Sequence, residues 1–182
     1  IVELLRPLLD ERRAARLDEV AASRLGGVVV VLEDLHDPHN GGAVLRSCEA
    51  MGIREVNIIA SRERFRVSEK VTQGADKWLD VLEHKSTEAS LSSLRQRGFR
   101  LAAAVPGVTM QLTDLDPLTP TALLMGNEHA GLTKEARAFC DVEFAIPLHG
   151  FSESLNLSVA TALCTFSMTR DGGRRLDGVG IS

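Results

Sequence analysis

The chain has 182 residues, which suits one domain with a full hydrophobic core. Apolar residues make up 44% of the sequence, so an intrinsically disordered protein is excluded. No apolar run reaches the roughly 20 residues needed to cross a bilayer, and the N-terminus lacks the apolar segment of a secretory signal. We therefore expect a cytoplasmic protein. The net charge of −4 neither indicates nor excludes a nucleic-acid partner, because local patches matter more than the sum.

The predicted elements alternate between helix and strand. Apolar residues at helical spacing predict a helix over residues 2–24, and the unbroken apolar run Val28–Leu32 predicts a strand buried on both faces. A polar loop over 34–42 then leads into a helix. The later strands are predicted near 56–60, 79–83, 99–105, 121–125 and 142–146, and the later helices near 68–74, 87–97, 133–139 and 154–168. The inner face of the last helix is predicted to carry Leu155, Val159, Leu163 and Phe166.

This alternation indicates an α/β fold, with a mainly parallel sheet and helices on both faces. We divide the chain into an N-terminal helical extension (1–25), a main domain (26–170) and a tail rich in glycine and charge that we expect to be flexible (171–182). The cysteines Cys48, Cys140 and Cys164 lie far apart without a CxxC spacing, so we predict reduced core thiols and no metal site.

Ligands of parallel sheets bind beyond the carboxyl ends of the strands. Three predicted loops, 34–42, 126–131 and 147–154, occupy such positions, and all are rich in glycine or small polar residues. Glycines at both ends of Gly126–Gly131 favour either an ordinary strand-to-helix turn or a close approach to a ligand. The segment lacks the lysine of a Walker loop, and the chain has no GxGxxG fingerprint or GxSxG motif after a strand.

Two polar residues near the first loop allow two interpretations each. Asn40 is either the cap of the following helix or a ligand-binding residue, and Arg46 is either a surface ion-pair partner or a phosphate clamp. The arginines of two patches, Arg62–Arg66 and Arg95–Arg100, are either a solvated surface or contacts for RNA phosphates. Phe65, within the first patch, either stacks on a base or packs in the core.

Three segments, Asn40–Arg46, Gly126–Gly131 and Ile146–Ala160, resemble in that order the three motifs of the SpoU/TrmH family. Members of this family are RNA ribose 2′-O-methyltransferases of the SPOUT class. The resemblance covers roughly residues 25–170, and the short N-terminal helix is most similar to the branch that methylates a guanosine ribose in the D-loop of tRNA.

The resemblance implies a C-terminal deep trefoil knot, formed by residues from about 121 to 165, and S-adenosylmethionine as the cofactor. It also implies a homodimer that packs through the knot region, with tRNA as the partner. By similarity, the catalytic residues are Arg46, Asn40, Glu128, Ser154 and Asn156. The cofactor-binding residues are Leu124, Gly126, Ile146, Leu148, Ser154 and Leu155. The RNA-binding residues are Arg46, Arg62, Arg64, Arg66, Arg12 and Arg13. Neither a metal nor a membrane is implied.

The resemblance leaves the role of Arg46 open. The family arginine is proposed to accept the proton of the ribose hydroxyl, whereas guanidinium chemistry favours a phosphate clamp that stabilises developing negative charge. Two other functions also stay open. One is ribosomal RNA methylation by the same chemistry, and the other is a knotted module that binds S-adenosylmethionine or RNA without catalysis.

Overall fold

A parallel sheet forms the centre of the molecule. The computed structural model describes residues 6–61, 65 and 69–170. The sheet has six strands in the order β3-β2-β1-β5-β4-β6, and every neighbouring pair is parallel. The strands are β1 (Val28–Glu33), β2 (Glu55–Ile59), β3 (Asp80–His84), β4 (Arg100–Ala104), β5 (Thr121–Met125) and β6 (Val142–Phe144). The predicted parallel α/β architecture is therefore confirmed.

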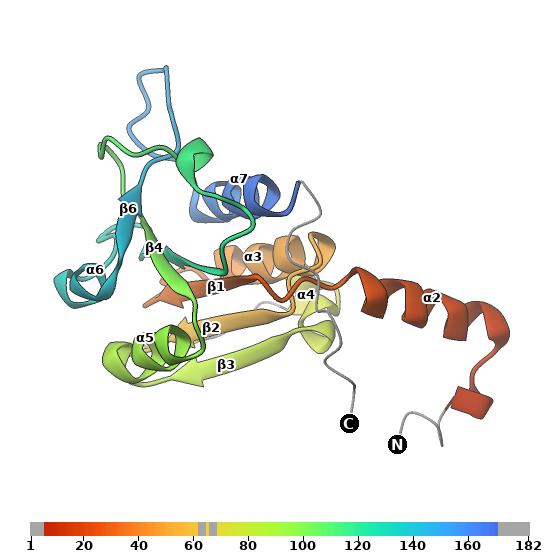
Figure 1. Cartoon of the computed structure of the whole chain (residues 1–182). Coiled ribbons are helices and arrows are strands. Elements are labelled where there is room, and N and C mark those ends of the chain that lie inside the picture. Colours follow the sequence, from red (N-terminus) through yellow and green to blue (C-terminus); the bar gives the residue numbers. More distant parts are fainter. Residues whose placement is uncertain (1–5, 62–64, 66–68, 171–182) are drawn as a thin grey trace.

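Helices cover both faces of this sheet (Figure 1). The α-helices are α2 (Glu11–Ser23), α3 (Pro38–Ala50), α4 (Glu69–Thr72), α5 (Thr87–Gln96), α6 (Lys134–Phe139) and α7 (Leu157–Thr169), and the 3-10 turns are η1 (Arg6–Leu8), η2 (Ala75–Trp78) and η3 (Leu112–Asp114). Alternate side chains of a strand point to opposite faces. Val30 thus packs with the core residues of α3 and α7, whereas Val31 packs with those of α5 and α6. This double burial explains the unbroken apolar run in β1.

The N-terminal helix is shorter than predicted. Helix α2 begins at Glu11, because the carboxylate of Asp10 accepts a hydrogen bond from the backbone N–H of Arg13 at 2.8 Å and caps the helix there. Residues 1–5 of the predicted helix lie outside the described part of the chain. No residue of α2 is buried, and Figure 1 shows the helix projecting away from the sheet. The helix therefore adds little to the core.

Two helix starts also differ from the prediction. Helix α3 begins at Pro38 and is capped by Asp37, whose carboxylate accepts from the backbone N–H of His39 at 2.8 Å. Proline suits the first helical position, so the helix includes Asn40 instead of starting after it. The last helix begins at Leu157 with Asn156 as its cap, and Ser154 precedes the helix. The cap interpretation of Asn40 is therefore wrong, and its side chain is available for other contacts.

The predicted inner face of α7 is also wrong. Val159, Leu163 and Phe166 are exposed, while the buried residues of the helix are Leu157, Thr161, Cys164, Thr165 and Met168. The buried threonine hydroxyls donate to carbonyls one turn earlier in the same helix, so they enter the core without unsatisfied polar groups. Val159, Leu163 and Phe166 therefore form an apolar outer face of the helix.

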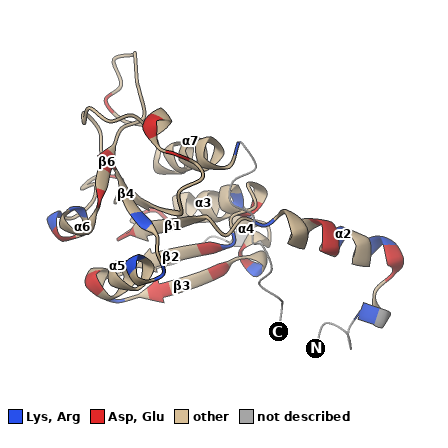
Figure 2. Cartoon of the chain, in the orientation of Figure 1, with Lys and Arg blue, Asp and Glu red and all other residues tan. Residues whose placement is uncertain are grey.

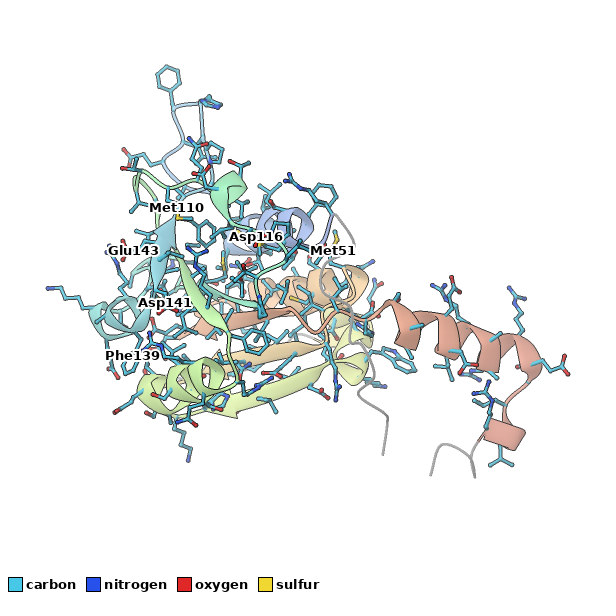
Figure 3. All side chains as sticks on the ribbon, in the orientation of Figure 1. Met51, Met110, Asp116, Phe139, Asp141 and Glu143 are labelled. Carbon is cyan, nitrogen blue, oxygen red and sulfur yellow. The ribbon has the colours of Figure 1, made fainter. Side chains whose placement is uncertain are left out.

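The chain leaves β6 close to the segment that follows β4. The backbone N–H of Ala145 donates to the carbonyl of Met110 at 2.9 Å, and the N–H of Leu112 donates to the carbonyl of Ala145 at 2.8 Å. Figure 3 labels Met110 above the strand that carries Glu143. A long loop then leads from here to α7, which packs beside α3 (Figure 1). Segments far apart in the sequence therefore meet at this corner of the fold.

The cysteines are core thiols, as predicted. Cys48 and Cys164 are buried, Cys140 is partly buried, and all three are free. Burial raises the pKa of each thiol to about 12, so none is a thiolate at neutral pH. Within the described ranges, none of the helices has the length and hydropathy of a membrane span.

Candidate active site

Three loops meet at the carboxyl edge of the sheet. The first follows β1 and leads into α3, the second joins β5 to α6, and the third joins β6 to α7. Strands β1 and β5 are neighbours, with Leu32 opposite Met125, so the first two loops start side by side. This arrangement agrees with the position predicted for a ligand site in a parallel sheet.

Glu128, from the second loop, binds the first loop through both carboxylate oxygens. Its Oε2 accepts from the backbone N–H of His36 at 3.1 Å, and its Oε1 accepts from the backbone N–H of Asp37 at 3.4 Å. The same Oε1 also accepts from the side-chain amide of Asn40 at 2.8 Å. The carboxylate therefore joins the start of α3 to the loop after β5.

Asn40 extends this connection to the third loop. Its Oδ1 accepts from the side-chain amide of Asn156 at 3.0 Å, and Oδ1 of Asn156 accepts from the backbone N–H and the hydroxyl of Ser158 at 2.9 and 2.6 Å. Glu128, Asn40 and Asn156 thus form one hydrogen-bonded chain, which we call the amide relay. Because the relay consumes both polar ends of the Asn40 amide, the orientation of that side chain is defined.

The relay changes the acidity of Glu128. Partial burial opposes the charged form, but hydrogen bonds from the Asn40 amide and from the backbone N–H groups of Glu128, His36 and Asp37 outweigh it. The net effect holds the pKa of Glu128 below its ordinary value. The side chain is therefore a carboxylate that accepts hydrogen bonds at neutral pH, and it is poorly suited to act as a general acid.

The shifted pKa predicts a pH-dependent stability. We expect the wild-type protein to unfold at a higher urea concentration than Glu128→Gln at about pH 7, because the folded state favours the charged form. This advantage is fully present above the ordinary glutamate pKa of about 4.3. It disappears as the pH falls through the lower pKa of the folded protein. Urea midpoints at about pH 7 and pH 3 measure the difference, with Glu83→Gln, at an exposed carboxylate on β3, as control. An advantage that grows towards low pH would contradict the prediction.

The structure does not join Arg46 and Ser154 to the amide relay. Arg46 is exposed on α3, about 9 Å further along the axis than Asn40 at 1.5 Å per residue. Within the described residues, its guanidinium has no hydrogen bond or ion pair. Ser154 is exposed in the loop before α7. Within the described residues, the surface ion-pair interpretation of Arg46 therefore finds no partner.

The predicted cofactor-binding positions lie at the end of β5 and along the second and third loops. Gly126 has no space for a side chain, because an added Cβ would lie 2.2 Å from the backbone nitrogen of Leu132 and 2.3 Å from the carbonyl carbon of Gly131. Leu124 is buried and Ile146 partly buried, while Leu148 is exposed in the loop after β6. These positions therefore lie at or beyond the carboxyl ends of β5 and β6.

A family model described as the SpoU rRNA Methylase family matches residues 27–166. The chain belongs to this family. The predicted family membership is confirmed, and the matched region includes all three loops of the candidate site.

Several relatives of this SpoU chain are named as tRNA-modifying enzymes. A tRNA (guanosine(18)-2′-O)-methyltransferase of Escherichia coli K12 is 32% identical over 163 residues, which cover 89% of this chain and 71% of the relative. An enzyme of the same name from Thermus thermophilus is 34% identical over 161 residues, covering 88% and 83%. The crystal structure of the A. aeolicus TrmH/SpoU tRNA modifying enzyme superposes with a TM-score of 0.81 at 29% identity, covering 88% of this chain and 82% of that one.

The residues predicted to contact RNA in this SpoU protein lie in different environments. Arg12 and Arg13 are exposed on α2. The positions Arg62, Arg64 and Arg66 lie outside the described residues. Phe65 packs against the core, and its ring lies 3.2 Å from the position of a Cβ on Gly41. The core-packing interpretation of Phe65 is therefore favoured over base stacking.

Two of the three arginines in the second patch, Arg95 and Arg97, form ion pairs. Arg97 donates two hydrogen bonds to the carboxylate of Glu55 at 2.8 and 2.6 Å, at the amino end of β2. Arg95 binds the carbonyl of Phe139 and the carboxylate of Asp141, both labelled in Figure 3 near the end of α5. These contacts lie at the edge of the sheet opposite the amide relay, so Arg95 and Arg97 are bound by groups of the same chain.

Sequence reasoning missed the role of Asn127 in the SpoU site. Its side-chain amide donates to the carbonyl of Asp34 at 2.6 Å, and its Oδ1 accepts from the backbone N–H groups of His129 and Ala130 at 2.9 and 3.0 Å. The bonds to His129 and Ala130 form an asparagine turn, a local pattern that a sequence starting with asparagine predicts. The bond to Asp34 spans 93 residues of sequence, and no local pattern predicts it.

A cavity of about 430 Å³ opens away from this site. It lies between α2, the end of α3 and the end of α7, and it contains none of the predicted site residues. Figure 3 labels Met51, one of its lining residues, near the end of the projecting helix where it joins the rest of the fold. Within the part of the chain that the structure describes, no group of His, Cys, Asp and Glu side chains is placed to hold a metal ion.

Proposed function

We propose that the protein transfers a methyl group from S-adenosylmethionine to the ribose 2′-hydroxyl of a guanosine in the D-loop of tRNA. The observation that carries the proposal is the amide relay, which joins one polar residue from each of the three family motifs. Relatives that are 32% and 34% identical and named as tRNA (guanosine(18)-2′-O)-methyltransferases support the same substrate. A tRNA substrate is consistent with a cytoplasmic enzyme.

The proposed cofactor is supported by a solved relative. An AdoMet-bound rRNA methyltransferase from Sinorhizobium meliloti superposes with a TM-score of 0.72 at 25% identity. We assign the backbones of Leu124, Gly126, Ile146, Leu148 and Leu155, together with Ser154, to cofactor binding. When bound, S-adenosylmethionine supplies an electrophilic methyl group and a neutral thioether leaving group. The protein therefore has only to bind, orient and neutralise charge around the ribose.

The chain's own residues divide these tasks. Arg46 binds the phosphate next to the target ribose and stabilises the negative charge that develops on the attacking oxygen. The Asn40 amide is held at both ends by Glu128 and Asn156, so it presents a fixed edge to the substrate. Arg12, Arg13 and the arginines at 62, 64 and 66 add sequence-independent contacts to tRNA phosphates.

The proposal predicts methylation of tRNA in preference to ribosomal RNA. We expect labelled methyl groups from S-adenosylmethionine to enter a tRNA pool, and nuclease mapping to place them on one guanosine ribose of the D-loop. Deoxyribose substitution at that nucleotide removes the acceptor hydroxyl and should abolish labelling. Labelling of ribosomal RNA alone would favour the ribosomal alternative, and cofactor binding without transfer to any RNA would favour the non-catalytic module.

A homodimer and a trefoil knot complete the proposed architecture. The outer face of α7 exposes Val159, Leu163 and Phe166, which recur at helical spacing. Figure 2 shows no charged residue along this helix, in contrast to α2, which carries both signs. A second copy packed on this face covers the apolar side chains. Membership of the SpoU family supports a knot within residues 121–165 of the methyltransferase domain, 26–170.

The proposed dimer predicts that a charge on the outer face of α7 will change the oligomeric state. We expect Phe166→Glu to shift the protein from dimer to monomer at micromolar concentration, because a buried unpaired carboxylate is costly at an interface. Leu118→Glu, at a side chain that is 65% exposed elsewhere, is the matched control and should leave the mass unchanged. Light scattering coupled to size-exclusion chromatography measures both. A monomeric wild-type protein would contradict the proposal.

A further inference from the structure

Glu33, the last residue of β1, is a buried carboxylate that the proposed mechanism does not use. It is 1% exposed. Its Oε2 accepts from the backbone N–H of Thr133 at 2.8 Å, and its Oε1 accepts from the hydroxyls of Thr133 and Thr87 at 2.8 and 3.2 Å. Thr87 begins α5 and Thr133 caps α6, so one carboxylate serves the first turns of two helices.

This burial is costly, and the fold compensates it with neutral donors. A buried carboxylate loses its hydration and needs hydrogen bonds to replace it. Within the described residues, no Lys or Arg forms an ion pair with Glu33, and its donors are one N–H and two hydroxyls. The amino ends of α5 and α6 add favourable partial charges. An apolar side chain at this core position would need no hydrogen-bond donors. The placement of three donors around Glu33 is therefore a specific feature of the fold.

Through Thr133, Glu33 holds one end of the loop that carries Glu128. This loop leaves β5 after Met125, which pairs with Leu32, and it returns at Thr133. Between them, Asn127 and Gly131 exchange two backbone hydrogen bonds, at 3.1 and 2.9 Å. The loop is therefore closed by its own backbone hydrogen bonds, and each of its ends is hydrogen-bonded to β1.

Three consecutive residues of β1 and its exit provide these attachments. Leu32 pairs with the outgoing strand, Glu33 binds the returning end at Thr133, and the carbonyl of Asp34 accepts from Asn127. The same stretch continues to His36 and Asp37, whose N–H groups bind Glu128. The direction of the Glu128 carboxylate towards Asn40 thus depends on where the returning end of the loop lies.

We propose that Glu33 is a positioning residue for methyl transfer: by holding Thr133, it sets the second loop so that Glu128 orients the Asn40 amide. This inference rests on the proposed function. Glu33 does not touch the substrate, so its loss is expected to change the rate of the chemical step more than the binding of tRNA or S-adenosylmethionine.

The test compares Glu33→Ala with Glu33→Gln. We expect Glu33→Ala to lower kcat about 100-fold while KM for tRNA stays within about threefold, because small displacements of positioned groups cost rate. Glutamine keeps an oxygen for the N–H of Thr133, and the two hydroxyls are able to accept from its amide, so Glu33→Gln should restore most of kcat. Equal losses in both variants would overturn the proposal, as would a normal rate in Glu33→Ala.

Asn57→Ala is the matched control. Asn57 is 2% exposed on β2 and hydrogen-bonds to Glu55 and His84, away from the loops. We expect it to lower the unfolding midpoint without changing kcat at temperatures where it stays folded. A loss of kcat as large as that of Glu33→Ala would assign the effect to general destabilisation and overturn the proposal.

A second readout does not depend on methyl transfer. The side-chain amide resonance of Asn40, assigned by its loss in Asn40→Ala, reports the bond to Glu128. We expect this resonance to shift in Glu33→Ala and in the milder Thr133→Ala, and to stay in place in Asn57→Ala. An unchanged resonance in both would overturn the positioning role. A shift in a protein that methylates no RNA would instead reject the proposed function alone.

Discussion

Arg46→Ala should abolish methylation of tRNA while cofactor binding stays intact. The guanidinium is exposed and makes no hydrogen bond within the described residues, so its removal leaves no buried group unpaired. Loss of one group that stabilises transition-state charge lowers kcat by about 100-fold to 1,000-fold. Labelled methyl transfer measures the rate, and titration calorimetry measures the dissociation constant for S-adenosylmethionine.

Arg46→Lys separates the two roles left open for this residue. Lysine keeps the charge but loses the planar fork of donors, so a phosphate clamp should retain part of the activity. If Arg46 accepts the ribose proton instead, the rate of the lysine variant should depend on pH differently from that of the wild type. Arg54→Ala, at an exposed arginine paired with Asp80 at the opposite edge of the sheet, is the control and should remain fully active. A normal rate in Arg46→Ala would reject both roles.

Among the substitutions considered, Gly126→Ala should lower the free energy of unfolding most. The added methyl group would lie 2.2 and 2.3 Å from backbone atoms of Leu132 and Gly131, and backbone cannot rotate away as a side chain does. The loop then has to open, at a cost of about 3 kcal/mol. Urea unfolding measures this loss as a lower midpoint. Because Gly126 also belongs to the proposed cofactor site, we expect a weaker affinity for S-adenosylmethionine.

Gly150→Ala is the matched control for this prediction. An added Cβ at Gly150 meets no atom within 4 Å, and the residue lies in the exposed loop before α7. Its unfolding midpoint should match that of the wild type. A Gly126→Ala protein with normal stability and normal cofactor affinity would show that the contact between Gly126 and Leu132 relaxes easily.

The amide relay explains why three short polar loops carry the family resemblance. Glu128 and Asn156 lie 88 and 116 residues after Asn40 in the sequence, yet both bind Asn40 directly. Each of them was a prediction from its motif alone, and the tertiary structure brings all three together. The same prediction included Arg46 and Ser154, which the single chain leaves outside the relay.

Local physics determined much of the fold from the sequence. The apolar run Thr121–Met125 matches β5, because a strand buried on both faces needs apolar residues at consecutive positions. The helix predicted near 133–139 matches α6, which Thr133 caps because its hydroxyl satisfies a backbone N–H one turn into the helix. These features depend on neighbours within a few residues, and the sequence contains those neighbours directly.

Only the tertiary structure decided the contacts between distant segments. Helix α7 is apolar around most of its surface, so its composition did not reveal that Thr161 faces the core while Phe166 faces outward. Asn40 has the residue type of a cap, and only the earlier start at Asp37 and Pro38 released it for Glu128. Glu33 has the sequence position of a polar strand end, and its burial follows from two helix starts that arrive 54 and 100 residues later. Such pairings depend on the path of the whole chain, which no local pattern records.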